Sequence, residues 1–370
     1  MKPIPVAFIG GSIHSAVGNT HRIAAQMDGR FHLAAGCFSR DAEINIQTGL
    51  AWGVSSRHIY TDWKSMLEEE KSVVVVLLTP TPHHWEVLEY ALSLNHRIIC
   101  EKSLTTSVRT TKLLAEQVLQ RSSSIHAVYN YTGYPMLREM REIINSGVLG
   151  ELIHCEIDMP QEGYLRRDSD GLTIKPQVWR QQDDYVPTVS LDLGVHVVNL
   201  FRFITNHSVL RIVGSYQTRG NIPGVVDSVS ALVECSNELK AEFRFGKTSL
   251  GHSNGLSISC FGTHGSVRWK QTDPEFLLIS DTQGVTRQIH RGSTPCHVAH
   301  LPRYNRFKAG HPSGFLEAFS NHYFDIAEDL DNGNQDSPFT FSSIDALTDM
   351  KILDALSTSV LQKQWVEVEE

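Results

Sequence analysis

The first third of the chain alternates between short apolar runs and stretches in which apolar residues recur at helical spacing. Residues 73–78 are apolar at every position, and a strand without a polar side must be covered on both faces, as in a parallel sheet. The predicted strands are 5–9, 31–37, 73–78, 97–100 and 125–129, and the predicted helices are 20–27, 41–50, 62–70, 85–94 and 108–119. This alternation predicts right-handed βαβ units in a doubly wound parallel sheet, an α/β fold.

The pattern changes after Tyr131, and we therefore predict two domains, 1–128 and 129–370. Strand-like runs now follow one another with little helix between them, which predicts an antiparallel sheet. The predicted strands are 152–158, 211–217, 228–235, 240–245, 256–260, 266–271 and 276–280, and the helices are 135–146, 195–204, 313–330 and 343–362. Residues 281–312 are rich in Gly, Pro, His and Arg, and a long surface excursion is expected there.

Charge and composition exclude several classes of protein. The chain has 33 Lys plus Arg and 41 Asp plus Glu, a net charge of −8, which disfavours a broad surface for nucleic acid or anionic lipid. Its longest apolar run, 73–78, is far shorter than the roughly 20 residues of a membrane helix. The N-terminus lacks the apolar core of a signal peptide, and the six widely spaced cysteines fit no disulfide or zinc pattern. We expect a cytoplasmic protein with reduced thiols.

A glycine-rich loop follows the first predicted strand. It contains Gly10, Gly11, Ser12 and Ile13, and the next glycine is Gly18. The G-x-G-x-x-G spacing is not met, but a loop between a first strand and a first helix is where backbone N–H groups meet a pyrophosphate. Its position favours a dinucleotide-binding loop over a plain glycine turn.

The second predicted strand ends in Ser39, Arg40 and Asp41. NAD sites usually place a carboxylate first at this tip, to accept from the ribose 2′-OH. A hydroxyl followed by a guanidinium suits a 2′-phosphate better, so the sequence favours NADP over NAD. In the alternative interpretation, Arg40 is a solvent-exposed residue that caps the next helix and Asp41 supplies the carboxylate.

A stiff loop with Thr79 and Pro80 follows the apolar strand, at the end where open α/β sheets bind ligands. His83 and His84 come next. Adjacent histidine side chains diverge and no further ligand pattern accompanies them, so no metal site is predicted.

Three residues are candidates for proton chemistry. Lys102 follows Glu101 at the end of a predicted strand, where a partly buried amine can act as an acid–base group. Asp192 and His196 are spaced i and i+4, so on a helix they share a face, and a carboxylate can orient an imidazole for proton transfer. In the alternative, Asp192 caps the helix 195–204 and His196 belongs to the core.

Together these features resemble the Gfo/Idh/MocA oxidoreductases over essentially the whole chain. The family's usual Glu-Lys-Pro motif is matched by Glu101-Lys102-Ser103, and its Asp-x-Gly-x-His motif by residues 192–196. Further matches are Thr79-Pro80 followed by His84, the turn 146–151, the pair Trp179-Arg180, and, for a sub-branch, residues 130–135 and His311-Pro312. The resemblance implies an N-terminal Rossmann domain and a C-terminal α/β domain with a large, mostly antiparallel open sheet.

The resemblance also implies an activity: hydride transfer between a nicotinamide cofactor and a hydroxyl or keto carbon of a sugar, sugar derivative or cyclitol. Lys102 would hydrogen-bond the reacting hydroxyl, His196 would be the acid–base, and Asp192 would bind a neighbouring hydroxyl. Residues 1–128 would hold the dinucleotide and 129–370 the substrate and the oligomer contacts. The implied cofactor residues are Gly10, Gly11, Ser12, Ile13, Ser39, Arg40, Thr79, Pro80, His84, Glu101, Lys102 and Asn130; the implied substrate residues are Tyr134, Trp179, Arg180 and His311.

Departures from the family pattern keep two alternatives open. Ser103 replaces the usual proline, residues 187–190 replace a double glycine, and Ser12 to His14 replace glycines of the dinucleotide loop. One alternative is an enzyme that recycles a tightly bound nicotinamide to cleave a glycosidic bond. The other is a non-catalytic protein that senses a sugar or dinucleotide. The resemblance also implies a homo-oligomer, a dimer or tetramer, because the open sheet usually serves as the interface in this family.

Overall fold

The computed structural model describes residues 2–121, 123–308, 310–333 and 337–369. The chain forms two compact units. The first contains the chain up to Gly133 and takes in Phe315–Leu347, and the second contains Tyr134–Gly314 and the chain from Thr348 on. The sequence pattern placed everything after residue 128 in one domain, because the return of a helix to a distant sheet leaves no local signal.

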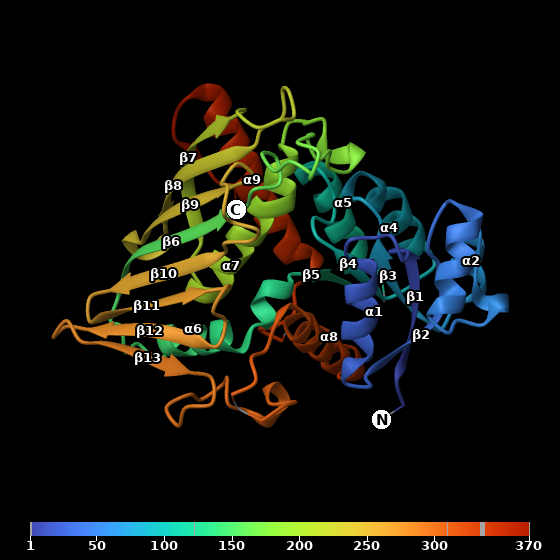
Figure 1. Ribbon diagram of the computed structural model, residues 1–370, viewed down its shortest axis with the longest axis horizontal. Helices are drawn as coiled ribbons and strands as arrows, with labels where there is room; N and C mark the ends of the chain where they lie inside the picture. Colours follow the sequence, from blue (N-terminus) through green and yellow to red (C-terminus); the bar gives the residue numbers. More distant parts are fainter. Residues whose placement is uncertain (1, 122, 309, 334–336, 370) are drawn as a thin grey trace. The chain divides into compact units, whose positions relative to one another are not determined.

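The first unit contains the predicted doubly wound parallel sheet (Figure 1). Its strands are β1 (Ile4–Gly10), β2 (Phe31–Cys37), β3 (Val74–Leu78), β4 (Ile98–Glu101) and β5 (Ile125–Val128), in the order β2-β1-β3-β4-β5. All neighbours pair in parallel. The strand order reverses between β1 and β3, and ligands of open α/β sheets bind beyond the carboxyl ends of the strands at such a point.

The helices of the first unit are α1 (Gly18–Met27), α2 (Ala42–Ala51), α3 (Trp63–Glu69), α4 (His84–Ser93), α5 (Val108–Leu119) and α8 (Phe315–Asp331). Local capping explains several starts. Asp62 Oδ2 accepts from the Ser65 amide at 2.9 Å before α3, and Ser107 Oγ accepts from the Thr110 amide at 3.3 Å before α5.

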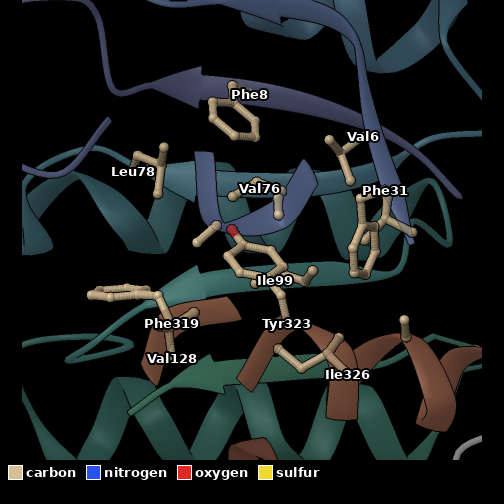
Figure 2. Close-up of a cluster of buried hydrophobic side chains, with 14 of the residues drawn as sticks. Val6, Phe8, Phe31, Val76, Leu78, Ile99, Val128, Phe319, Tyr323 and Ile326 are labelled. Carbon is tan, nitrogen blue, oxygen red and sulfur yellow. The ribbon is translucent and has the colours of Figure 1, made fainter. Parts of the chain in front are cut away.

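Helices α1 and α8 bury their apolar faces on one side of this sheet (Figure 2). Phe319, Tyr323 and Ile326 of α8 join strand side chains such as Val76 in one buried cluster. The Tyr323 and Phe31 rings meet edge to face with centroids 5.5 Å apart. Burial of aromatic and branched side chains therefore fixes α8 in the first unit although it comes late in the chain.

The second unit holds a nine-stranded sheet whose neighbours are antiparallel except for β6 and β9, as predicted for a mostly antiparallel sheet (Figure 1). The strands are β6 (Leu152–Pro160), β7 (Val209–Gln217), β8 (Ser228–Cys235), β9 (Lys240–Gly246), β10 (Ser257–Gly262), β11 (Gly265–Lys270), β12 (Phe276–Asp281), β13 (Thr286–His290) and β14 (Val366–Glu367). Their order is β13-β12-β11-β10-β6-β9-β8-β7-β14.

One face of the large sheet is apolar and covered by helix. The helices are α6 (Pro135–Asn145), α7 (Val195–Thr205) and the part of α9 (Ser343–Gln362) from residue 348 on. Phe201 of α7 meets Phe243 of β9 with ring centroids 5.3 Å apart. The opposite face is polar and carries the ion pair of Asp158 with Arg244, at 2.9 Å between Oδ1 and Nε. This alternation is typical of an antiparallel sheet with one solvated face.

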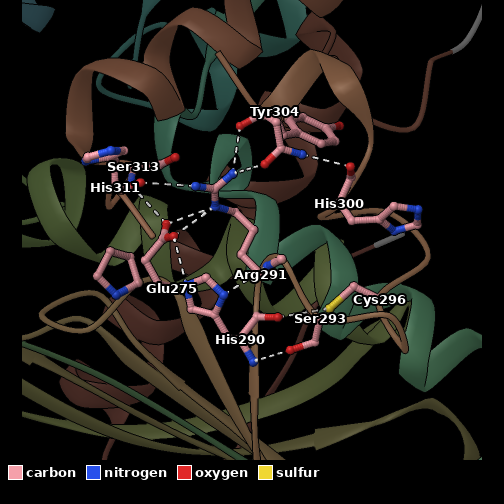
Figure 3. A network of polar contacts seen from close by, with 12 residues as sticks. Glu275, His290, Arg291, Ser293, Cys296, His300, Tyr304, His311 and Ser313 are labelled. Atoms are coloured by element: carbon pink, nitrogen blue, oxygen red, sulfur yellow. Dashed lines mark hydrogen bonds and ion pairs between the residues drawn. The ribbon is translucent and has the colours of Figure 1, made fainter. Parts of the chain in front are cut away.

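The expectation of a surface excursion over 281–312 is wrong in part. Residues Thr286–His290 form the edge strand β13, whose mostly exposed, polar side chains give no apolar signal. The next residue, Arg291, is buried and donates to Glu275 at 2.9 Å, to the Tyr304 carbonyl at 2.9 Å and to Asn305 at 2.6 Å (Figure 3). The segment is therefore anchored from inside by a guanidinium.

Two further expectations concern the chain as a whole. All six cysteines are buried and none forms a disulfide among the described residues. In the part of the chain that the structure describes, no helix has the length and apolarity to cross a membrane.

Candidate functional site

The loop after β1 is shaped by glycines that nothing larger could replace. Gly10 and Gly11 have φ of 79° and 75°, which L-residues rarely adopt. A Cβ on Gly11 would lie 2.5 Å from Leu78 Cδ1, and one on Gly18 would lie 1.8 Å from the Gly11 carbonyl oxygen. The loop therefore closes tightly between the end of β3 and the first residue of α1.

The start of α1 is open to an anion. The first turn of α1 carries no acidic residue. The Gly18 amide, at the start of the helix, donates a long hydrogen bond of 3.2 Å to the Ser15 hydroxyl. Within the described residues, the amides of Gly11 and Ser12 have no hydrogen-bond acceptor. Free N–H groups in a glycine loop that leads into a helix fit a pyrophosphate, and the dinucleotide role of this loop stays a prediction.

At the end of β2, the structure separates the roles of three neighbours. Asp41 Oδ1 accepts from the Ile44 amide at 3.0 Å and so caps α2, while Ser39 Oγ accepts from the Asp41 amide at 3.1 Å. Arg40 is exposed, and no described residue bonds its guanidinium. The helix cap is thus the carboxylate and not Arg40, which is left available to a ligand.

His84, predicted to contact the cofactor, is buried, and that contact stays a prediction. Its Nδ1 is 2.9 Å from the Ser103 carbonyl oxygen and its Nε2 is 2.7 Å from that of Thr79. Burial lowers the pKa of the His84 imidazole, although both carbonyl contacts act in the other direction. The side chain ties together the two loops that follow β3 and β4, and this geometry makes it a positioning residue.

Two buried polar atoms at the carboxyl end of the parallel sheet have no partner among the described residues. They are Thr79 Oγ1, after β3, and Asn130 Nδ2, after β5. The short turn of Asn130 is held on α8 by Asn321, whose Nδ2 donates to the Gly133 carbonyl at 2.9 Å. An unsatisfied buried polar group costs about 1–3 kcal/mol, so these atoms fit a site completed by a polar ligand.

Glu101 is the last residue of β4 and directly precedes Lys102. One carboxylate oxygen lies 2.7 Å from His21 Nε2. Burial alone would raise the pKa of the Glu101 carboxyl, but the hydrogen bond with His21 and the charge of Lys102 hold it below its usual value. Lys102 itself is partly exposed at the strand end, where the sequence predicted a catalytic amine.

In the second unit, Asp192 lies in a π-helical turn, Ser190–Gly194, that runs into α7. Asp192 and His196 are both buried, at 8% and 7% exposed. A Cβ on Gly194 would lie 2.7 Å from Phe245 Cζ, so glycine lets this turn pack on β9. The alternative in which Asp192 caps the helix is not seen, because it lies inside continuous helical structure; π-turns of this kind are frequent at functional sites.

Two cations bind the Asp192 carboxylate. Arg180 contacts it with Nε and Nη2, each at 3.0 Å, and Lys247 Nζ lies 2.5 Å from Oδ2. The Arg180 guanidinium also stacks on Trp179, 4.3 Å from the ring centroid. Sequence reasoning missed Lys247; the signal that could have found it is a lysine directly after the apolar-alternating strand β9.

Tyr134 and His311, predicted to contact substrate, have other surroundings. Tyr134 is 2% exposed, accepts from Gln271 Nε2 at 3.3 Å and packs on Trp269 with centroids 5.2 Å apart. His311 is exposed, and its carbonyl accepts from Arg291 at 3.2 Å (Figure 3). The geometry gives Tyr134 a place in the core and His311 a place on an anchored loop, and their contact with substrate stays a prediction.

Comparison with known proteins decides the family. Residues 4–129 match the model of an oxidoreductase family with an NAD-binding Rossmann fold, and residues 137–268 match that of the GFO/IDH/MocA C-terminal domain. The chain belongs to the Gfo/Idh/MocA oxidoreductase family. The predicted family, α/β fold and nicotinamide-dependent oxidoreductase class are thereby confirmed, and the preference for NADP stays a prediction.

Individual relatives of this Gfo/Idh/MocA chain are distant. An uncharacterized oxidoreductase, YfiI of Bacillus subtilis, is 26% identical over 90% of this chain and 87% of its own length. A levoglucosan dehydrogenase of Pseudarthrobacter phenanthrenivorans is 22% identical over 100% of this chain and 99% of its own length. The structure of an inositol dehydrogenase homologue from Azotobacter vinelandii, complexed with NADH and myo-inositol, matches with a TM-score of 0.88 at 23% identity, covering 99% of this chain and 98% of that one.

Proposed function

We propose that the protein is an NAD(P)-dependent dehydrogenase or reductase that acts on a CH–OH carbon of a sugar, sugar derivative or cyclitol. The pairing of Asp192 with His196 on one buried helical turn, in a chain of this family, carries the proposal. The levoglucosan and myo-inositol named for two relatives support a polyol substrate. The unpartnered amides of Gly11 and Ser12 and the side chains of Thr79 and Asn130 support a nucleotide in the first unit.

The residues divide the chemistry among them. A bound nicotinamide supplies or accepts the hydride at the reacting carbon. In the oxidative direction the hydroxyl loses its proton to His196, while Lys102 hydrogen-bonds the same oxygen. A carboxylate bonded to two cations is an acceptor, so Asp192, held by Arg180 and Lys247, accepts from a neighbouring substrate hydroxyl and orients the ring.

The first test is a turnover screen over polyols, sugars and cyclitols with added NAD⁺ or NADP⁺. The proposal expects hydride transfer that requires the added cofactor and is lost in His196→Asn. Turnover that needs no added cofactor would instead support the recycling enzyme that cleaves glycosidic bonds. Cofactor or sugar binding without any turnover would support the sensor.

For the cofactor, we propose a preference for NADP. Arg40 is exposed without a partner among the described residues, and the neighbouring carboxylate of Asp41 is occupied as the cap of α2. A guanidinium at this strand end binds a 2′-phosphate. Fluorescence titration should show tighter binding of NADPH than NADH, and Arg40→Ala should remove that difference. Equal affinities in the wild type would contradict the preference.

We also propose a cytoplasmic homo-oligomer, a dimer or tetramer, assembled through the open face of the large sheet. That face is hollowed by about 590 Å³ over β6 to β9, with Glu156, Asp158 and Arg244 among the residues that line it. Light scattering tests the oligomer, and a monomer at micromolar concentration would contradict it.

A further inference from the structure

A buried hydrogen-bonded chain leads from α8 through α1 to the end of β4. Tyr323 Oη lies 2.8 Å from His21 Nδ1, and His21 Nε2 lies 2.7 Å from Glu101 Oε1. Tyr323 and His21 are 1% and 0% exposed. These three residues, which we call the relay, come from segments that are far apart in the sequence.

One tautomer of His21 uses both contacts of the relay. Burial raises the pKa of the Tyr323 phenol far above its ordinary value, so the hydroxyl keeps its proton and is able to donate it. With the ring proton on Nε2, His21 Nδ1 accepts from Tyr323 and Nε2 donates to Glu101. The variants below are designed on this tautomer.

The relay is also held sterically. The His21 ring meets the edges of Phe319 and Tyr323, with centroids 5.0 and 5.8 Å apart. Figure 2 shows Tyr323 and Phe319 within the buried apolar cluster of the first unit. Rings packed at these angles cannot swing away, so the position of the Glu101 oxygen follows from the core.

We propose that Tyr323 and His21 are positioning residues that hold the Glu101 carboxylate in one orientation and, through it, fix Lys102 at the carboxyl end of β4. Glu101 and Lys102 are adjacent in the chain, so holding the Glu101 side chain restrains the backbone from which the Lys102 side chain extends. The relay also joins α1, which begins at the dinucleotide loop, to this strand end. The inference rests on the proposed function for Lys102, and it adds two residues that lie in no motif.

The decisive variant is Tyr323→Phe, which removes one oxygen and keeps the packed ring. It leaves His21 Nδ1 without a donor, and loss of one buried hydrogen-bond partner corresponds to about a tenfold effect. We expect kcat to fall about tenfold while the KM for the polyol changes less than about twofold, and the Kd for reduced cofactor to rise about fivefold. Cofactor fluorescence gives the Kd without any need for a turning-over substrate.

A conservative rescue separates positioning from packing. In His21→Gln the amide keeps one donor and one acceptor at a separation close to that of the ring nitrogens, and we expect kcat and Kd within about threefold of wild type. His21→Leu loses both groups and should match or exceed the loss in Tyr323→Phe. If His21→Leu does not fold, Tyr323→Phe and His21→Gln still decide the outcome.

The matched control is Tyr60→Phe, in the same unit, which removes a phenol bonded to Glu70 at 2.9 Å and to Glu69 at 3.1 Å, two residues outside the relay. It should lower the Tm by a few degrees without changing kcat or Kd. The relay is refuted if Tyr323→Phe behaves like Tyr60→Phe. If the wild-type protein binds cofactor but turns over no polyol, only the proposed function is contradicted, because the Kd for cofactor still tests the relay. If the wild-type protein binds neither NADH nor NADPH, the proposed function and the relay are both overturned.

Discussion

Two buried carboxylates of the second unit, Asp192 and Glu275, each bind an arginine, and their surroundings differ. The Arg291 side chain beside Glu275 is 2% exposed, and its remaining donors meet the carbonyls of Tyr304 and His311. The Arg180 side chain beside Asp192 is 23% exposed and shares its carboxylate with Lys247. The Glu275–Arg291 pair is completed by backbone carbonyls of the protein itself. The Asp192 carboxylate instead binds two cations and lies four residues before His196, the candidate acid–base.

A buried arginine–carboxylate pair thus has a different role according to the groups that complete it. Backbone carbonyls from a loop make the Glu275 pair an anchor for that loop (Figure 3). The Arg180–Asp192 pair is partly exposed, and its Asp192 lies four residues before His196, so the pair is placed to bind a ligand. Removing a partner should therefore cost folding free energy in one cluster and activity in the other.

The largest effect should come from His196→Asn. Loss of a general acid–base group lowers kcat by about 10³-fold, within the range of 10²–10⁴ seen for such groups. The free energy of unfolding should stay close to that of wild type, because the asparagine remains small and polar in a helix. Steady-state kinetics measures kcat, and urea unfolding measures the free energy of unfolding. Activity within tenfold of wild type would remove His196 from the chemistry.

Arg291→Met should have the largest effect on stability. It leaves Glu275 buried with its main cationic partner gone, which costs about 3 kcal/mol or more. Urea unfolding measures this, with Arg287→Met on β13 as control, since Arg287 is 74% exposed and sits 3.7 Å from Asp281. The kcat of the folded Arg291→Met fraction should remain near wild type. An equal, small destabilisation in both variants would erase the distinction between the two clusters.

Lys247→Met tests the other cluster. Asp192 keeps Arg180 on both oxygens, so the fold should lose little, but Oδ2 loses its second cationic partner, which lies at 2.5 Å. We expect kcat/KM to fall about 30-fold, as for loss of a charge-assisted hydrogen bond of about 2 kcal/mol. Lys247→Arg should recover part of it. Unchanged kinetics in Lys247→Met would leave Arg180 as the sole functional partner.

The apolar pattern was enough to predict most elements of the fold. Strands 31–37 and 228–235 and helices 108–119 and 343–362 have the predicted bounds, because each is a regular amphipathic or fully apolar run. The edge strand β13 was not predicted, since its side chains are mostly exposed. The pattern likewise could not place α8 against α1, because that contact depends on packing between distant segments.

The candidate site was predicted where chemistry lies in short motifs, and not where it depends on contacts between them. Lys102, Asp192 and His196 stand in recognisable spacings. Lys247 meets Asp192 across 55 residues, and Tyr323 meets His21 across 302. Single residues of this kind carry no local pattern, so only the folded chain reveals them.

The smallest predicted effect concerns His84, which is buried like the two carboxylates but has no charged residue in direct contact among those the structure describes. Burial lowers its pKa below 6.5, and the carbonyls of Thr79 and Ser103 offset only part of that shift. Below pH 6.5 the unfolded chain therefore binds a proton that the folded chain does not, so stability falls as the pH falls from 6.5 toward the folded pKa.

The slope of this loss is at most about 1.4 kcal/mol per pH unit. Between pH 7.5 and 5.5, wild type should lose about 1 kcal/mol more unfolding free energy than His84→Gln, which cannot titrate and still donates to one carbonyl. Urea unfolding of both proteins at the two pH values gives the difference directly. A wild type that gains stability relative to the variant at pH 5.5 would show a charged imidazolium between the two carbonyls. In that case the two carbonyls, together with the charge of the Glu101 carboxylate, would outweigh the cost of burying the charged imidazole.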